Sequence, residues 1–146
     1  MTKKKSALEN LANNLGDFFR KSAEPGCVSA YLFGSAASDR AHRESDIDVG
    51  VLLSRDKYPT SRERFQERVR LSACLGQELK HGLVDVVILN DAPPLLGRRI
   101  VTSGTRVFCA DQKADHAFVR DVQLRAADLE PFLRRTSRVK LAAIAK

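Results

Sequence analysis

Apolar residues recur along this chain in two patterns that predict helices and strands. Spacings of three and four place apolar side chains on one face of a helix, whereas short apolar runs bounded by turn residues are typical of buried strands. The first stripe consists of Leu8, Leu11, Leu15, Phe18 and Phe19. Ser6 and Glu9 ahead of it resemble a capping box, so we expect the first helix to begin at Ser6 and to end before Pro25.

The rest of the chain alternates between the two patterns. Strands are predicted at Cys27–Phe33, Ile47–Leu53, Leu83–Leu89 and Arg106–Cys109. A charged helix is predicted over 61–80, with Phe65, Val69, Leu71, Leu75 and Leu79 facing inward. A short helix should run from Pro93-Pro94 through Val101. After Lys113 we expect two helices, roughly 113–129 and 131–144, separated at Pro131 because proline cannot continue the hydrogen-bond ladder.

This order predicts an α/β (α+β) fold in which helices flank a small mixed sheet of about four strands. The length of 146 residues suits one domain, with a core over about 6–110 and a helical C-terminal segment over 113–144. Charged residues make up 29% and apolar residues 43%, which is typical of a soluble globular chain. Because no apolar run is long enough to span a bilayer and no signal-type segment follows Met1, we expect no membrane contact and a cytoplasmic location.

The positive charge is unevenly distributed. Residues 1–97 hold 14 basic and 13 acidic side chains, whereas residues 98–146 hold 11 and 5, and together they give the net charge of +7. A basic third raises the possibility of RNA binding. Its aromatic residues are only Phe108, Phe118 and Phe132, and the last two fit an apolar helix stripe. We therefore expect a solvated or partner-facing helix surface and no direct nucleic-acid binding.

Two aspartates lie at the start of the second predicted strand. Asp46 and Asp48 are two residues apart, so strand alternation places both carboxylates on the same face. Oxygen ligands so close together suit Mg²⁺, which takes one or two carboxylates and completes its shell with water and phosphates. The alternative is a structural pair of strand-end carboxylates held by turn N–H groups.

Asp85 interrupts the third apolar strand and is the third candidate acid. Beside the second strand it would join the same cation site or accept a proton from a hydroxyl group. The structural alternative is a buried acid paired with Arg98 or Arg106. Gly34 and Ser35, which end the first strand, supply a close backbone approach and a hydroxyl donor for phosphates.

These residues resemble a known family. Gly34-Ser35, ten intervening residues and Asp46-Ile47-Asp48 match the GS-x10-DxD signature of the DNA polymerase β-like superfamily, and the short length resembles its minimal nucleotidyltransferases. Val84–Asn90 resembles the strand of the third acid, and Ala92–Leu96 with Arg98–Ile100 resembles the helix after it. The segment Asp128–Leu133 resembles the tail of the type VII antitoxins.

The resemblance implies an enzyme that transfers AMP from ATP to a tyrosine hydroxyl of a partner HEPN-domain RNase toxin, which neutralises the toxin. By the same resemblance, Gly34 and Ser35 would hold the β and γ phosphates. Asp46 and Asp48 would hold two Mg²⁺ ions, and Asp85 one ion together with the attacking hydroxyl. The partner would form a hetero-oligomer with this chain.

The chain departs from the family at one place. Many relatives have Gly-Ser-x-Ala-Arg-Gly after the first strand, whereas this chain has Ser38 and Asp39 at the last two positions. An acid near a triphosphate is unfavourable, so Arg40 and Arg43 are the candidates to compensate. Two alternatives remain open: an antitoxin that acts by binding its toxin, with a weak or silent pocket, and a small-molecule nucleotidyltransferase of the aminoglycoside type.

Overall fold

The computed structural model describes residues 3–22, 26–34, 47–80 and 84–144. Its elements, in chain order, are α1 (Lys3–Lys21), β1 (Cys27–Phe33), β2 (Ile47–Leu53), α2 (Ser61–Glu78), β3 (Val84–Ile88), the 3-10 helix η2 (Leu89–Asp91), α3 (Pro94–Ser103), β4 (Thr105–Cys109) and α4 (Gln112–Ile144). None of the helices in these ranges is long and apolar enough to cross a membrane.

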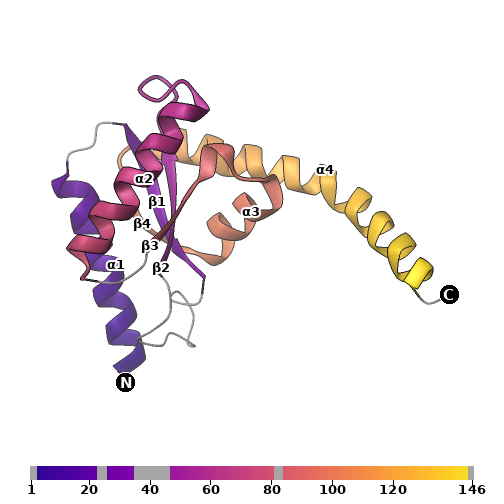
Figure 1. Ribbon diagram of the computed structural model, residues 1–146, viewed down its shortest axis with the longest axis horizontal. Coiled ribbons are helices and arrows are strands. Elements are labelled where there is room, and N and C mark those ends of the chain that lie inside the picture. The colour runs from indigo at the N-terminus through magenta and orange to yellow at the C-terminus, as the bar shows by residue number, and fades with distance from the viewer. Residues whose placement is uncertain (1–2, 23–25, 35–46, 81–83, 145–146) are drawn as a thin grey trace.

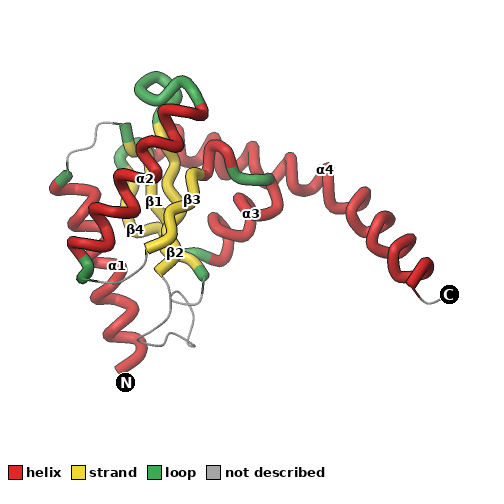
Figure 2. Tube along the Cα trace, viewed as in Figure 1, coloured by secondary structure: helices red, strands yellow, loops and turns green. Residues whose placement is uncertain are grey.

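The strands form one mixed sheet in the order β3-β2-β1-β4 (Figures 1 and 2). β1 pairs antiparallel with both β2 and β4, and β2 pairs in parallel with β3. The parallel pair is possible because α2 provides the crossover between the two strands. This architecture confirms the predicted mixed sheet flanked by helices.

Helices cover the sheet on both faces, and each face has its own core. On one face, Leu15 and Phe19 of α1 and Leu71 and Leu75 of α2 pack against the strands. On the other face, Ile100 of α3 packs with Val28, Tyr31 and Leu52, and Phe118 of α4 lies against this cluster. Successive side chains of β2 point to opposite faces of the sheet and so enter different cores. Val49 and Val51 belong to the first core and Leu52 to the second.

Two predicted helix ends are wrong. The first helix already includes Lys3, so Ser6 lies inside it and is not its N-cap. The C-terminal segment is one helix, α4, with Pro131 inside it, and not two helices. A proline removes one hydrogen bond and pushes against the preceding turn, which a helix can accommodate by bending. Figure 1 shows α4 bending as its C-terminal part extends away from the sheet.

The inward face of α2 also differs from the prediction. Leu71 and Leu75 are buried as expected, but Phe65 and Val69 are 58% and 55% exposed. Arg64 and Glu67 occupy the buried positions instead. Arg64 can be buried there because its guanidinium donates to both carboxylate oxygens of Asp91, at 2.9 and 3.0 Å, and to the Tyr58 carbonyl at 2.8 Å.

Candidate functional site

Two of the predicted acids lie opposite each other on neighbouring strands. Asp48 is the second residue of β2 and Asp85 the second residue of β3, and the parallel register pairs them directly. Side chains at paired positions of neighbouring strands point to the same face. The flanking residues Ile47, Val49, Val84 and Val86 belong to the core under α1 and α2, so both carboxylates lie toward the face that α3 and α4 cover. Asp48 is half-buried, and the Asp85 side chain is 51% exposed.

Gly34 brings the end of β1 against this pair. The last residue of β1, Phe33, is the antiparallel partner of Asp48, and Gly34 follows it with a φ of +78°. This left-handed conformation favours glycine because it has no Cβ. A Cβ at this position would overlap Oδ2 of Asp48. The backbone at Gly34 therefore lies so close to the Asp48 carboxylate that only glycine fits there.

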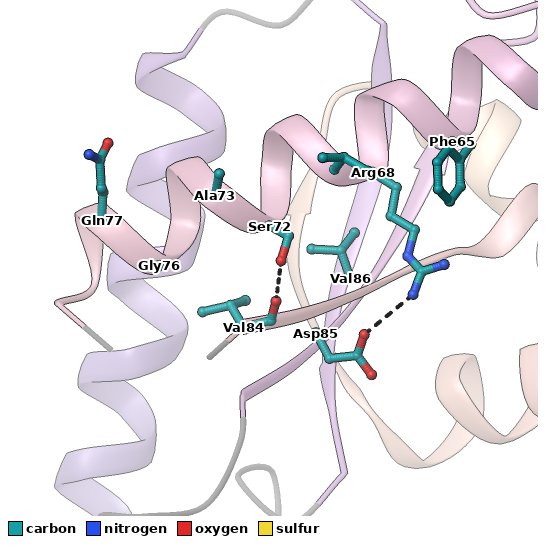
Figure 3. Close-up of a pocket in the computed structure, with 10 residues that line it drawn as sticks. Phe65, Arg68, Ser72, Ala73, Gly76, Gln77, Val84, Asp85 and Val86 are labelled. Carbon is teal, nitrogen blue, oxygen red and sulfur yellow. Dashed lines mark hydrogen bonds and ion pairs between the residues drawn. The ribbon is translucent and has the colours of Figure 1, made fainter. Parts of the chain in front are cut away.

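The surroundings of Asp85 contradict the alternative of a buried acid paired with Arg98 or Arg106. Its ion-pair partner is Arg68 of α2, with 3.7 Å between Nη2 and Oδ1 (Figure 3). Arg98 and Arg106 pair instead with Glu130, at 3.4 Å, and with Asp115, at 3.0 Å. Position explains this pairing, since β3 is an edge strand of the sheet and the long Arg68 side chain reaches Asp85 from the helix beside that edge.

Four predicted site residues, Ser35, Arg40, Arg43 and Asp46, lie outside the described residues. The described part therefore brings together Gly34, Asp48 and Asp85. Within it, no three His, Cys, Asp or Glu side chains gather in a cluster that could hold a metal ion. Asp46, the third predicted carboxylate ligand, immediately precedes β2.

The chemistry of this donor set fits a hard divalent cation. Asp48 and Asp85 offer only carboxylate oxygens, and these are the ligands that Mg²⁺ prefers. Two carboxylates at paired strand positions repel each other, and a shared cation removes that repulsion. The exposure of Asp85 leaves that acid accessible to a ligand from solvent. The close approach at Gly34 places backbone against the Asp48 carboxylate.

Sequence reasoning missed two charged residues that matter here. No pattern distinguishes Arg68 from the other three arginines of α2. Asp115 is buried and accepts hydrogen bonds from the hydroxyls of Ser29, at 2.7 Å, and Tyr31, at 2.6 Å. A signal for Asp115 did exist, because it lies seven residues before Val122 on the apolar stripe of α4. This second cluster is structural, since it joins α4 to β1.

Comparisons with known proteins agree with this geometry. The family model described as polymerase beta, nucleotidyltransferase, matches residues 13–113. A curated relative, "Protein adenylyltransferase MntA" of Shewanella oneidensis, is 29% identical over 94 residues. That alignment covers 64% of this chain and 63% of the relative, so the chain spans less than two thirds of the relative's length.

Solved structures show the same fold. A chain of a toxin–antitoxin complex crystallised with AMP-PNP is 26% identical, has a TM-score of 0.65 and covers 86% of this chain and 98% of its own. A chain of a mutant MntA toxin–antitoxin complex is 25% identical, has a TM-score of 0.62 and covers 86% of this chain and 96% of its own. The family match includes β1, β2 and β3, and with them Gly34, Asp48 and Asp85. This chain therefore belongs to the polymerase beta nucleotidyltransferase family.

Proposed function

We propose that this chain is an antitoxin enzyme that transfers AMP from ATP to a tyrosine hydroxyl of a HEPN-domain RNase toxin, in a Mg²⁺-dependent reaction, and thereby neutralises the toxin. The observation that carries the proposal is the in-register pair of Asp48 and Asp85 with Gly34 against it. The relative named protein adenylyltransferase and the 26% identical toxin–antitoxin chain crystallised with AMP-PNP support the reaction and the kind of partner.

Each residue has a distinct role in this proposal. Asp48 and Asp85, with Asp46, would hold two Mg²⁺ ions, which stabilise charge on the attacking and leaving oxygens when they are bound. Gly34 and Ser35 would bind the β and γ phosphates, and Arg40 and Arg43 would offset the charge of Asp39.

The proposed transfer is a nucleophilic displacement at the α-phosphorus of ATP. The tyrosine oxygen bonds to the α-phosphorus while the bond from that phosphorus to the bridging oxygen breaks, and pyrophosphate leaves. Asp85 is the acid at the exposed edge of the sheet, where an incoming hydroxyl can reach it, and it would take the hydroxyl proton.

The test is the intact mass of the toxin co-expressed with this chain. With the wild-type chain we expect the toxin mass to increase by one or more AMP units. Asp48→Asn should reduce transfer by about 100-fold or more, because the loss of one metal ligand removes several kcal/mol of transition-state stabilisation. Asp56→Asn is the matched control, since Asp56 is exposed and follows the opposite end of the same strand.

The same experiment separates the proposal from an antitoxin that acts only by binding. An unmodified toxin that still co-purifies with the wild-type chain and is still inactive would contradict AMP transfer. It would support neutralisation by binding alone.

A further inference from the structure

The α2 helix has a second apolar face, whose side chains lie outside the two core clusters. Phe65 and Val69 are four residues apart and therefore lie on one side of the helix, and more than half of each side chain is exposed. A different side of the helix carries the buried Leu71 and Leu75. Phe65 and Val69 thus contribute little to the core and leave an apolar surface in contact with solvent.

This surface borders a hollow that ends at the candidate acid. A cavity of about 640 Å³ lies between α2 and β3, and Figure 3 shows Arg68, Val86 and Asp85 around it. A neighbouring cavity of about 520 Å³ shares Phe65 and Arg68 and reaches Leu96 of α3. Together the two hollows follow β3, which forms one edge of the sheet. We call this surface, made by Phe65, Arg68, Val69, Val84, Asp85 and Val86, the α2–β3 groove.

We infer that the α2–β3 groove receives the segment of the partner protein that carries the hydroxyl group to be modified. This inference rests on the proposed function and specifies where its acceptor docks. The groove is continuous with the proposed site because Asp85 belongs to both. A side chain with an apolar body and a terminal hydroxyl would pack on Phe65 and Val69 while its oxygen reaches Asp85.

The chemistry of the groove favours a protein segment over a small cationic acceptor. Most of its wall is apolar and offers few partners to a molecule rich in hydroxyl and amino groups. Arg68 already pairs with Asp85 at 3.7 Å, so the groove offers no unpaired acid to an amino sugar among the side chains of its wall. The two hollows also extend along the edge strand, which suits a stretch of polypeptide. These features argue against the aminoglycoside-type alternative.

A competing surface lies on α4, where Leu124 and Phe132 are 62% and 63% exposed. Its C-terminal part extends away from the sheet (Figure 1), so a segment docked there would not lie at Asp85. A partner held only by α4 would leave the α2–β3 groove without a role. The two surfaces can therefore be separated by matched pairs of substitutions.

The test measures AMP transfer to the purified toxin with the full-length chain. The groove variant is Phe65→Ala/Val69→Ala, and the matched control is Leu124→Ala/Phe132→Ala, which removes two equally exposed apolar side chains. We expect the groove variant to raise the KM for the toxin at least tenfold. Its affinity for AMP-PNP and its thermal midpoint should stay at wild-type values, because neither side chain belongs to the core.

A second variant, Val69→Gln, keeps the side-chain size at an exposed helix position and should raise the same KM in a folded protein. A groove variant that transfers AMP with the wild-type KM overturns the inference, and so does a KM increase confined to the α4 control. Absence of transfer by the wild-type chain itself would instead overturn the proposed function and the inference with it.

Discussion

At the scale of single residues, Gly34 is restricted both by its backbone conformation and by the space around it. Its φ of +78° costs an L-residue about 1–2 kcal/mol, and a Cβ would also overlap the Asp48 carboxylate. We expect Gly34→Ala to lower the free energy of unfolding by about 2 kcal/mol or more and to abolish AMP transfer. Urea denaturation and the toxin mass assay measure the two effects.

A second variant separates the two causes. Asn adopts left-handed backbone more readily than Ala but carries the same Cβ. Gly34→Asn should therefore recover part of the stability and none of the transfer, because the overlap with Asp48 remains. Recovery of transfer in this variant would contradict the importance of that close approach.

The residues that sequence reasoning found differ in kind from those it missed. The placement of Gly34, Asp48 and Asp85 near one another was predictable because each interrupts or ends an apolar strand, where a glycine or an acid is unusual, whereas their roles in the site stay predictions. The ion pair of Arg68 with Asp85 was not predictable, because it forms only when β3 lies at an edge of the sheet, beside α2. Ser35, Arg40, Arg43 and Asp46 stay predictions, since they lie outside the described residues.

At the scale of elements, Asp115 fixes α4 to the sheet. It is 1% exposed and accepts hydrogen bonds from Ser29 and Tyr31 of β1 and from Arg106 of β4. We expect Asp115→Ala to lower the free energy of unfolding by about 2–4 kcal/mol, because it leaves the two buried hydroxyls of Ser29 and Tyr31 without their acceptor. Asp121→Ala on the same helix is the control and should cost less than about 1 kcal/mol, since its pair with Arg125 is exposed.

The same cluster makes stability depend on alkaline pH. Burial, together with the hydrogen bond to Asp115, raises the pKa of Tyr31 above its ordinary value of 10.0. A raised pKa in the folded state stabilises the protein fully below the unfolded value, and this contribution is lost as pH rises through the folded value. The free energy of unfolding should therefore fall above about pH 10.

Denaturation of Tyr31→Phe between neutral and alkaline pH checks this linkage. The variant lacks the titrating hydroxyl, so its stability should fall less over the alkaline range than that of the wild type. An identical alkaline loss in wild type and Tyr31→Phe would contradict the role of this hydroxyl.

Element positions were more predictable than element ends and faces. The predicted strands Cys27–Phe33 and Ile47–Leu53 have the same bounds as β1 and β2. Short apolar runs between turn residues are too short for a typical helix and therefore favour a buried strand. The apolar periodicity of α2 did not show which side of the helix is buried, because Phe65 with Val69 and Leu71 with Leu75 form two separate apolar sets. The ion pair of Arg64 with Asp91 places Arg64 on the buried side, and the sequence does not reveal that pair. The predicted break at Pro131 was wrong for a similar reason. A proline inside a bent helix and a proline between two helices give the same sequence pattern.

At the scale of the whole molecule, the sheet separates two cores and leaves its β3 edge beside the candidate site. α1 and α2 cover one face, and α3 with the first part of α4 covers the other (Figure 2). Asp48 and Asp85 lie on neighbouring strands at the same end of this sheet. A divalent cation bound by both carboxylates in the folded state would stabilise that state over the unfolded chain, where the two side chains are not held together. Cation binding and global stability should therefore be linked.

This linkage is measurable as a shift in thermal unfolding. At a Mg²⁺ concentration tenfold above its dissociation constant, the folded state should gain about 1.4 kcal/mol, and removal of the ion with a chelator should reverse the gain. Asp48→Asn/Asp85→Asn should lose the shift because it lacks both described carboxylates of the site. Asp56→Asn should retain it, since that acid lies beyond the other end of β2. An equal shift in the double variant would place the cation elsewhere on the molecule, so the paired aspartates would not be its ligands.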